Sequence, residues 1–174
     1  MLVTRLADHF GARWAVGPRC LQAAVRAAGR PIRLVLPETF MNSSGDAIAE
    51  RLRYWRLDPG SLLVAHDDVD LPLGRFRFRT GGSAGGQKGV ESVIDRIGED
   101  FARLKLGVGR PPAPLTTEDW VLSRLTTDEQ AVAREVIETA GEAVLVALES
   151  GLPEAMNRFH SLPDVTLDSA ASDT

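Results

Sequence analysis

The sequence is poor in cysteine and has no long apolar run, and each shortage excludes a class of protein. Its one cysteine, Cys20, cannot form an internal disulfide, which fits a reducing compartment and favours a buried structural thiol. No Cys/His pair has the spacing of metal ligands, so no metal site is expected. The apolar runs are far shorter than a membrane span and no signal peptide is visible, so we expect a cytoplasmic protein with no membrane partner.

Length and charge narrow the possibilities further. The chain has 174 residues, 44% apolar and 25% charged, which is ordinary for one soluble domain with a sizeable core. Its net charge of −4 argues against nucleic-acid binding. Residues 75–110, however, carry eight Lys/Arg and four acids, which makes this segment +4 and the remainder −8. A local basic field attracts phosphate groups; a chance cluster of solvated charges is the alternative.

Apolar periodicity and turn residues predict a mixture of helices and strands. Helices are expected at about 2–10, 45–56, 90–97, 127–150 and 152–159, and strands at about 21–28, 32–36, 62–65, 75–79 and 104–108. Ser43 or Ser44 is expected to cap the second helix, and Thr126 or Thr127 the long one. With no repeat and no linker, residues 1–162 are expected to form one domain, followed by a disordered tail at 163–174.

The segment from Ser61 to Gly89 holds most of the candidate site residues. Its first part, residues 62–65, reads as a strand buried on both faces. Three carboxylates, Asp67, Asp68 and Asp70, are expected just past this strand. Acids are seldom buried without partners, and ligands of open α/β sheets bind at the carboxyl ends of strands. A turn residue or a helix cap is the structural alternative for each of them.

The second part of this segment is basic and then rich in glycine. Residues 75–79 read Arg-Phe-Arg-Phe-Arg, the alternation of a half-exposed strand, which predicts an exposed row of three arginines. The glycine-rich loop at 81–86 precedes a helix, where backbone amides can approach an anion. A solvated edge strand is the alternative for the arginines. The loop fits neither the P-loop nor the dinucleotide spacing, which disfavours a nucleotide-binding oxidoreductase.

Five stretches together resemble the bacterial-type peptidyl-tRNA hydrolases over about residues 2–160. They are Phe40-Met-Asn followed by Ser44-Gly, residues 64–72, the loop at 81–89, residues 103–111 and Asn157-Arg-Phe-His160. The resemblance implies a single α/β domain, with a mixed twisted sheet flanked by helices, that acts as a monomer. It also implies hydrolysis of the ester that joins a stalled peptide to tRNA, with peptidyl-tRNA as partner and without metal or cofactor.

The resemblance assigns roles to individual residues. Asp67 matches the acid that orients and supports the catalytic histidine of the family, and Asn42 matches the asparagine that binds the peptide or positions water. Phe40 and Met41 match the wall of the neighbouring pocket. Lys88 stands where the family usually has an asparagine that contacts the substrate. Separately from the resemblance, the +4 charge of residues 75–110 predicts that four cations bind tRNA phosphates: Arg75, Arg77, Arg79 and Lys105.

Two departures from the family pattern stand out. Gln87 replaces a usual histidine beside Lys88, and it keeps hydrogen bonding without titrating. The family's opening strand and its Thr-Arg-His-Asn turn, which holds the catalytic histidine, are not found; His9, His66 and His160 cannot be assigned that role. A native start upstream of Met1 is the favoured interpretation. The alternative is a short, non-catalytic relative that binds RNA, although intact Asp67 and Asn42 argue against it.

Overall fold

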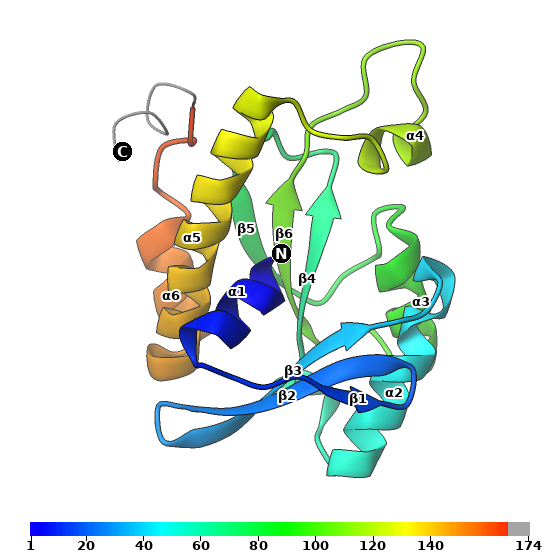
Figure 1. Ribbon diagram of the computed structural model, residues 1–174, viewed down its shortest axis with the longest axis vertical. Coiled ribbons are helices and arrows are strands. Elements are labelled where there is room, and N and C mark those ends of the chain that lie inside the picture. Colours follow the sequence, from blue (N-terminus) through cyan, green and yellow to red (C-terminus); the bar gives the residue numbers. More distant parts are fainter. Residues whose placement is uncertain (167–174) are drawn as a thin grey trace. The chain divides into compact units, whose positions relative to one another are not determined.

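Helices and strands are interspersed along the chain, as expected for an α/β domain. The computed structural model describes residues 1–166 and is drawn in Figure 1. It divides into two compact units. Unit 1 contains Met1–Leu2, His66–Phe78 and the chain from Leu104 onward, and unit 2 contains Val3–Ala65 and Arg79–Arg103. In the described range, no helix is long and apolar enough to cross a membrane.

A three-stranded antiparallel sheet forms the first part of unit 2. β1 (Ala15–Gly17) pairs with β2 (Cys20–Ala27), which pairs with β3 (Arg30–Pro37) (Figure 1). Ala28 and Gly29 join β2 to β3 with positive φ angles of 48° and 74°, as the tight turns of twisted hairpins require. The hairpin is therefore confirmed, whereas the short β1 was not predicted.

The core of unit 2 lies around two helices, α2 (Ser44–Trp55) and α3 (Lys88–Ile97), whose buried residues form one cluster. The buried members of the cluster are Ile48, Leu52, Val90, Val93 and Phe101. Both helices end close to where the sequence predicted, at Arg56 in the left-handed conformation and at Gly98 with φ of 81°. Each apolar stripe recurs at three or four residues, so each helix turns one face to this core.

The two helices touch through Gly45. Its amide donates to Ser92 Oγ at 3.0 Å, and a Cβ at this position would lie 2.9 Å from the Val93 nitrogen and closer still to the Ser92 carbonyl group. The predicted position of the cap is confirmed at Ser43, but the expected hydrogen bond is absent, since the Ser43 side chain accepts no amide of the helix. The Gly45 amide is satisfied across the helix pair instead, because α3 approaches so closely.

The second sheet has the order β4 (Leu63–Asp68), β6 (Ala102–Gly107), β5 (Phe76–Thr80). Ala102 N donates to Leu62 O and Val108 N to Asp68 O, so β4 and β6 run parallel. Gly81 N donates to Phe101 O and Gly107 N to Arg75 O, so β6 and β5 run antiparallel. The sheet is therefore mixed, as expected.

Two expectations about β4 are wrong. All six of its residues are half-buried, so it is not a strand buried on both faces. It also continues to Asp68, so Asp67 and Asp68 lie within the strand and not beyond it. The hydrogen bond from Val108 to Asp68 accounts for the extra length, because pairing with β6 persists to that residue.

Two helices of unit 1 begin at a threonine whose side chain caps the helix. α4 (Thr117–Val121) is capped by Thr116, which accepts from the Asp119 amide at 3.1 Å. α5 (Thr127–Ser150) begins with a capping box: Thr126 Oγ1 accepts from Glu129 N, and Glu129 Oε2 accepts from Thr126 N at 2.8 Å. This confirms Thr126 as the cap. α6 (Leu152–Phe159) follows Gly151.

The chain after α6 lies against the start of β5 within unit 1. His160 Nε2 accepts a hydrogen bond of 2.9 Å from the Phe78 amide, and its ring stacks on that of Phe78. Asp164 ion-pairs with Arg75, and Val165 N donates to Gly74 O at 2.9 Å. Two residues of the expected tail thus make defined contacts, and residues 167–174 lie outside the described range.

Acid is expected to destabilise unit 1 through His160. Burial, and then the charge of Arg77, lower the pKa of His160 below its usual 6.5. The neutral ring that accepts from Phe78 is therefore favoured above pH 6.5, and its contribution to the free energy of unfolding is lost as the pH falls through the folded-state pKa. Urea unfolding at stepped pH values checks this. His160→Gln should flatten the profile, and an equal slope in both proteins would contradict it.

Candidate functional site

The acids on β4 and just after it differ in their partners and in their exposure. Asp68 is only 10% exposed and ion-pairs with Lys105 of β6, whose side chain is 25% exposed. Burial alone would raise the pKa of Asp68, but hydrogen bonds from Lys105 and from the Asp70 amide, with the Lys105 charge, lower it overall. Asp67 is half-buried beside it. Asp70 is exposed and pairs with Arg110 at 2.8 Å.

His66 precedes these acids and has an unusual environment. Its Nδ1–H donates to the backbone oxygen of Asp67 at 2.7 Å, which leaves the Nε2 lone pair as its acceptor. Nε2 is buried and has no hydrogen-bond partner among the described atoms. Burial lowers the pKa of His66, and the nearby Asp67 backbone and acidic charges oppose this shift. The ring is thus neutral near pH 7, with its basic nitrogen shielded from solvent.

The four predicted tRNA contacts fall into two groups. Arg77 and Arg79 are exposed on β5, with Phe78 buried between them, as the alternating pattern predicts. The prediction of an exposed row of three arginines is wrong for Arg75, which is half-buried, precedes β5 and is held by Asp164. Lys105 is held by Asp68. Two of the four charges are therefore neutralised within unit 1.

Three of the predicted substrate-binding residues form an exposed turn in unit 2. Phe40 is 88% exposed and Met41 55% exposed at η1 (Met41–Ser43), a single helical turn that also carries Asn42. Met41 lies against the first turn of α3, because a Cβ at Gly89 would meet its sulfur at 2.6 Å. Lys88, the residue before Gly89, is exposed at the start of α3. We refer to Phe40, Met41, Asn42 and Lys88 as the η1 cluster.

The N-terminus of α3 is closed to an anion by Gln87. Its Oε1 accepts from the amides of Gly89 at 2.6 Å and Val90 at 3.0 Å. Those amides would otherwise face a bound phosphate, since a helix N-terminus attracts negative charge. At this helix, the position predicted for an anion is therefore filled by the neutral side-chain amide of Gln87. The hydrogen bonds of Gln87 cap the helix.

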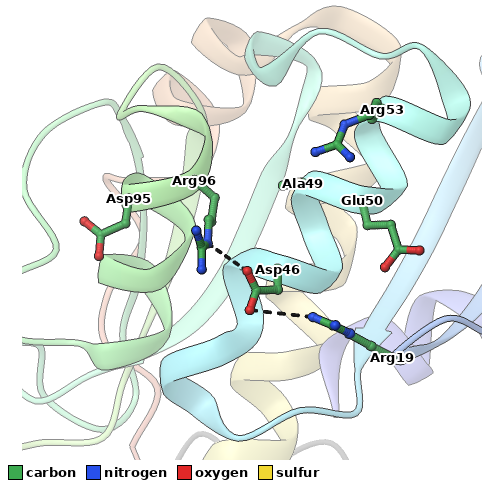
Figure 2. Close-up of a pocket in the computed structure, with 7 residues that line it drawn as sticks. All are labelled: Arg19, Asp46, Ala49, Glu50, Arg53, Asp95 and Arg96. Carbon is green, nitrogen blue, oxygen red and sulfur yellow. Dashed lines mark ion pairs between the residues drawn. The ribbon is translucent and has the colours of Figure 1, made fainter.

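A polar pocket of about 530 Å³ lies elsewhere in unit 2. Figure 2 shows Asp46 of α2 between Arg19, at 3.6 Å, and Arg96 of α3, at 2.7 Å. The other charged residues of its lining are Glu50, Arg53 and Asp95. Three arginines face three acids, so the pocket has no net charge to attract phosphate, and it contains none of the predicted site residues.

Sequence reasoning did not assign a role to Arg103. It is 1% exposed on β6, and its guanidinium donates to the backbone oxygens of Gly82 and Ser83. Little in the sequence indicated that Arg103 is buried. It directly precedes Leu104 of the predicted strand 104–108, and an arginine beside an apolar strand residue is expected to be exposed. In the described part of the chain, no group of three His, Cys, Asp or Glu side chains is placed to hold a metal ion.

Comparison with known proteins assigns this arrangement to one family. The family model described as "Peptidyl-tRNA hydrolase" matches residues 1–166. A peptidyl-tRNA hydrolase of Deinococcus deserti is 43% identical over 165 residues, covering 92% of this chain and 75% of that protein. One from Synechococcus sp. is 46% identical, covering 93% and 73%.

A solved structure gives the same result. The crystal structure of peptidyl-tRNA hydrolase from Acinetobacter baumannii superposes with a TM-score of 0.84 at 31% identity, covering 90% of this chain and 81% of that one. The comparisons of sequence and of fold therefore agree on the family, and the residues that the family model matches include Asp67 and the η1 cluster. This chain belongs to the peptidyl-tRNA hydrolase family.

Proposed function

We propose that this protein hydrolyses the ester bond between peptide and tRNA in peptidyl-tRNA, as a monomer in the cytoplasm. The observation that carries the proposal is that this member of the family keeps both Asp67, half-buried on β4, and Asn42, exposed on η1. A protein that only held RNA would need neither a half-buried carboxylate nor an exposed amide at these positions.

The reaction needs a base that removes a proton from water. Water then attacks the ester carbonyl carbon, the bond from that carbon to the ribose oxygen breaks, and the ribose oxygen takes up a proton. An imidazole suits this role near neutral pH, and a carboxylate that accepts from its Nδ1–H fixes the tautomer and stabilises the imidazolium. We assign the carboxylate role to Asp67 and the orientation of the peptide to the Asn42 amide, which both donates and accepts.

The three histidines of the chain are poorly arranged for the base. His160 uses Nε2 to accept from Phe78, and the Nε2 of His66 is buried. His9 is exposed on α1 (Leu2–His9), with its ring against Phe10. Within this proposal, the base is a histidine supported by Asp67, as the family resemblance implies; no Thr-Arg-His-Asn sequence occurs in these 174 residues.

Release of peptide from peptidyl-tRNA tests the function directly. We would compare the 174-residue chain with an extended chain, which carries the N-terminal segment of the Deinococcus deserti relative ahead of Met1. The extended chain is expected to cleave about 10²–10⁴-fold faster, the usual contribution of a general base. Equal rates, abolished by His66→Ala, would make His66 the base. Binding of tRNA without cleavage by either chain would favour the RNA-binding alternative.

Binding of tRNA is expected to depend on Arg77 and Arg79 more than on Arg75. Each phosphate contact adds about one to the slope of log affinity against log salt concentration. Arg77→Ala combined with Arg79→Ala should weaken binding and reduce the slope by about two. Arg75→Ala is the matched control, because Asp164 already holds its charge. Titration of labelled tRNA at several salt concentrations measures both, and a slope unchanged by the double substitution would contradict the assignment.

A further inference from the structure

Arg103 is a buried cation that has no carboxylate partner. Its side chain is 1% exposed, and among residues 1–166 it takes part in no ion pair. Its guanidinium stacks on the ring of Phe101, with 4.9 Å between Cζ and the ring centroid. A buried charge is costly unless hydrogen bonds compensate it, so the groups that bind this guanidinium must be held in place.

Those groups are backbone oxygens of the glycine-rich loop, residues 81–86. Nη1 of Arg103 donates to Ser83 O at 2.6 Å, and Nη2 donates to Gly82 O. The loop has no regular structure of its own, and four of its glycines have positive φ: Gly81, Gly82, Gly85 and Gly86. Glycine at such angles leaves an unfolded loop with many conformations, so ordering it requires strong contacts.

The other hydrogen bonds of the loop lie at its two ends. Gly81 N donates to Phe101 O at 3.1 Å, and Gln87 N donates to Ala84 O at 3.2 Å. Ala84 also packs against the apolar cluster of unit 2, and Arg103 provides the hydrogen bonds to the middle of the loop. Hydrogen bonds from a charged fork are the strong kind, and two parallel ones also fix the direction in which the acceptors point.

The outer side of the same loop carries Arg79. A Cβ at Gly82 would lie 3.3 Å from Arg79 Nε, so this exposed side chain lies directly on Gly82. Burial, and then the charge of Arg79, lower the pKa of Arg103, while Glu99 opposes the shift. Two guanidinium groups therefore flank Gly82: Arg103 hydrogen-bonds it from the core, and Arg79 lies against its solvent side. The loop leads on to Gln87 and Lys88.

We propose that Arg103 is a positioning residue for tRNA binding, which clamps the glycine-rich loop from within so that Arg79 and Lys88 face the phosphates in a fixed geometry. The proposal rests on the proposed function for the identity of the ligand. It assigns Arg103 no contact with tRNA, since the guanidinium is buried. It also accounts for the direction of the Gly82 and Ser83 carbonyl groups, which accept from the buried guanidinium, while Arg79 lies on the solvent side.

Hydrogen exchange of the loop amides and tRNA affinity together test this role. Arg103→Met keeps an unbranched stem as far as the position of Nε but removes the charge and both donors. We expect loop exchange to rise about tenfold or more, with Val93 on α3 still protected, and tRNA affinity to fall by a similar factor. Arg103→Lys retains one charged donor group and should recover part of the affinity. Arg79→Ala is the matched control, which should weaken binding with loop exchange unchanged.

The outcomes separate the two proposals. Unchanged loop exchange in Arg103→Met, or a faster-exchanging loop with unchanged tRNA affinity, would overturn the positioning role. If the methionine variant does not fold, Arg103→Lys decides the matter alone, since a residue that merely fills space would leave loop exchange and affinity at the parent values. Failure of the parent to bind tRNA would reject the proposed function, and then the positioning role for tRNA fails with it, whatever the loop exchange shows.

Discussion

Gly45→Ala is expected to lower the free energy of unfolding by about 3 kcal/mol, because the new methyl group would overlap backbone atoms of α3. Ser92 and Val93 offer no flexible side chain that could move aside, since the clash is with their main-chain atoms. The substitution would also force α2 and α3 apart and thereby weaken the hydrogen bond from the Gly45 amide to Ser92 Oγ. Denaturant unfolding followed by circular dichroism measures the loss.

Gly141→Ala on α5 is the matched control for this effect. A Cβ at Gly141 would meet only the Leu2 Cδ1 atom, at 4.0 Å, which is ordinary van der Waals contact. Alanine favours a helix interior over glycine by about 0.5–1 kcal/mol, so this variant should be slightly more stable than the parent. Equal stability of the two alanine variants would show that α2 and α3 do not pack as closely as described.

Asp67→Asn is expected to slow peptide release by about 10²–10⁴-fold in the extended chain. An asparagine keeps the size of the side chain but cannot support an imidazolium, and its amide can turn the histidine to the wrong tautomer. The affinity for tRNA should not change, because the carboxylate takes no part in binding phosphates. Single-turnover release of labelled peptide from peptidyl-tRNA, with tRNA binding measured alongside, gives both quantities.

Asp70→Asn in the same segment is the control for charge removal. Asp70 is exposed and pairs with the exposed Arg110, and such surface pairs contribute about 1 kcal/mol or less to stability. We expect its turnover to match that of the parent. If Asp67→Asn also matched the parent, Asp67 would be a structural residue of β4 and not part of the reaction.

Local sequence signals predicted most of the elements. The hairpin of β2 and β3 follows from Gly29 between two apolar runs, and Thr126 with Glu129 three residues on marks the start of α5. Both signals depend on residues close in sequence, which bring their own turn or cap geometry with them. The same reasoning failed for the side-chain hydrogen bond expected of Ser43, because Ser92, 49 residues later in the chain, supplies the oxygen for α2.

The candidate site was predicted by residue type but not by environment. Arg75, Arg77, Arg79 and Lys105 read alike in the sequence. Within residues 1–166, however, acids hold Arg75 and Lys105 and no ion pair is formed by Arg77 or Arg79. The acceptors of Arg103 are backbone oxygens, which every residue carries and no sequence pattern reveals. Pairings of this kind are decided by the tertiary fold, so the sequence could not distinguish the exposed cations from the neutralised ones.

The interleaving of the two units also sets the order in which the chain can acquire structure. Synthesis from the N-terminus completes unit 2 at Arg103, whereas the segment His66–Phe78 belongs to unit 1 and emerges before its partners. Lys105 for Asp68, Arg110 for Asp70 and His160 for Phe78 are all made later. The segment His66–Phe78 therefore cannot complete these contacts until the chain has been translated through α6 to His160.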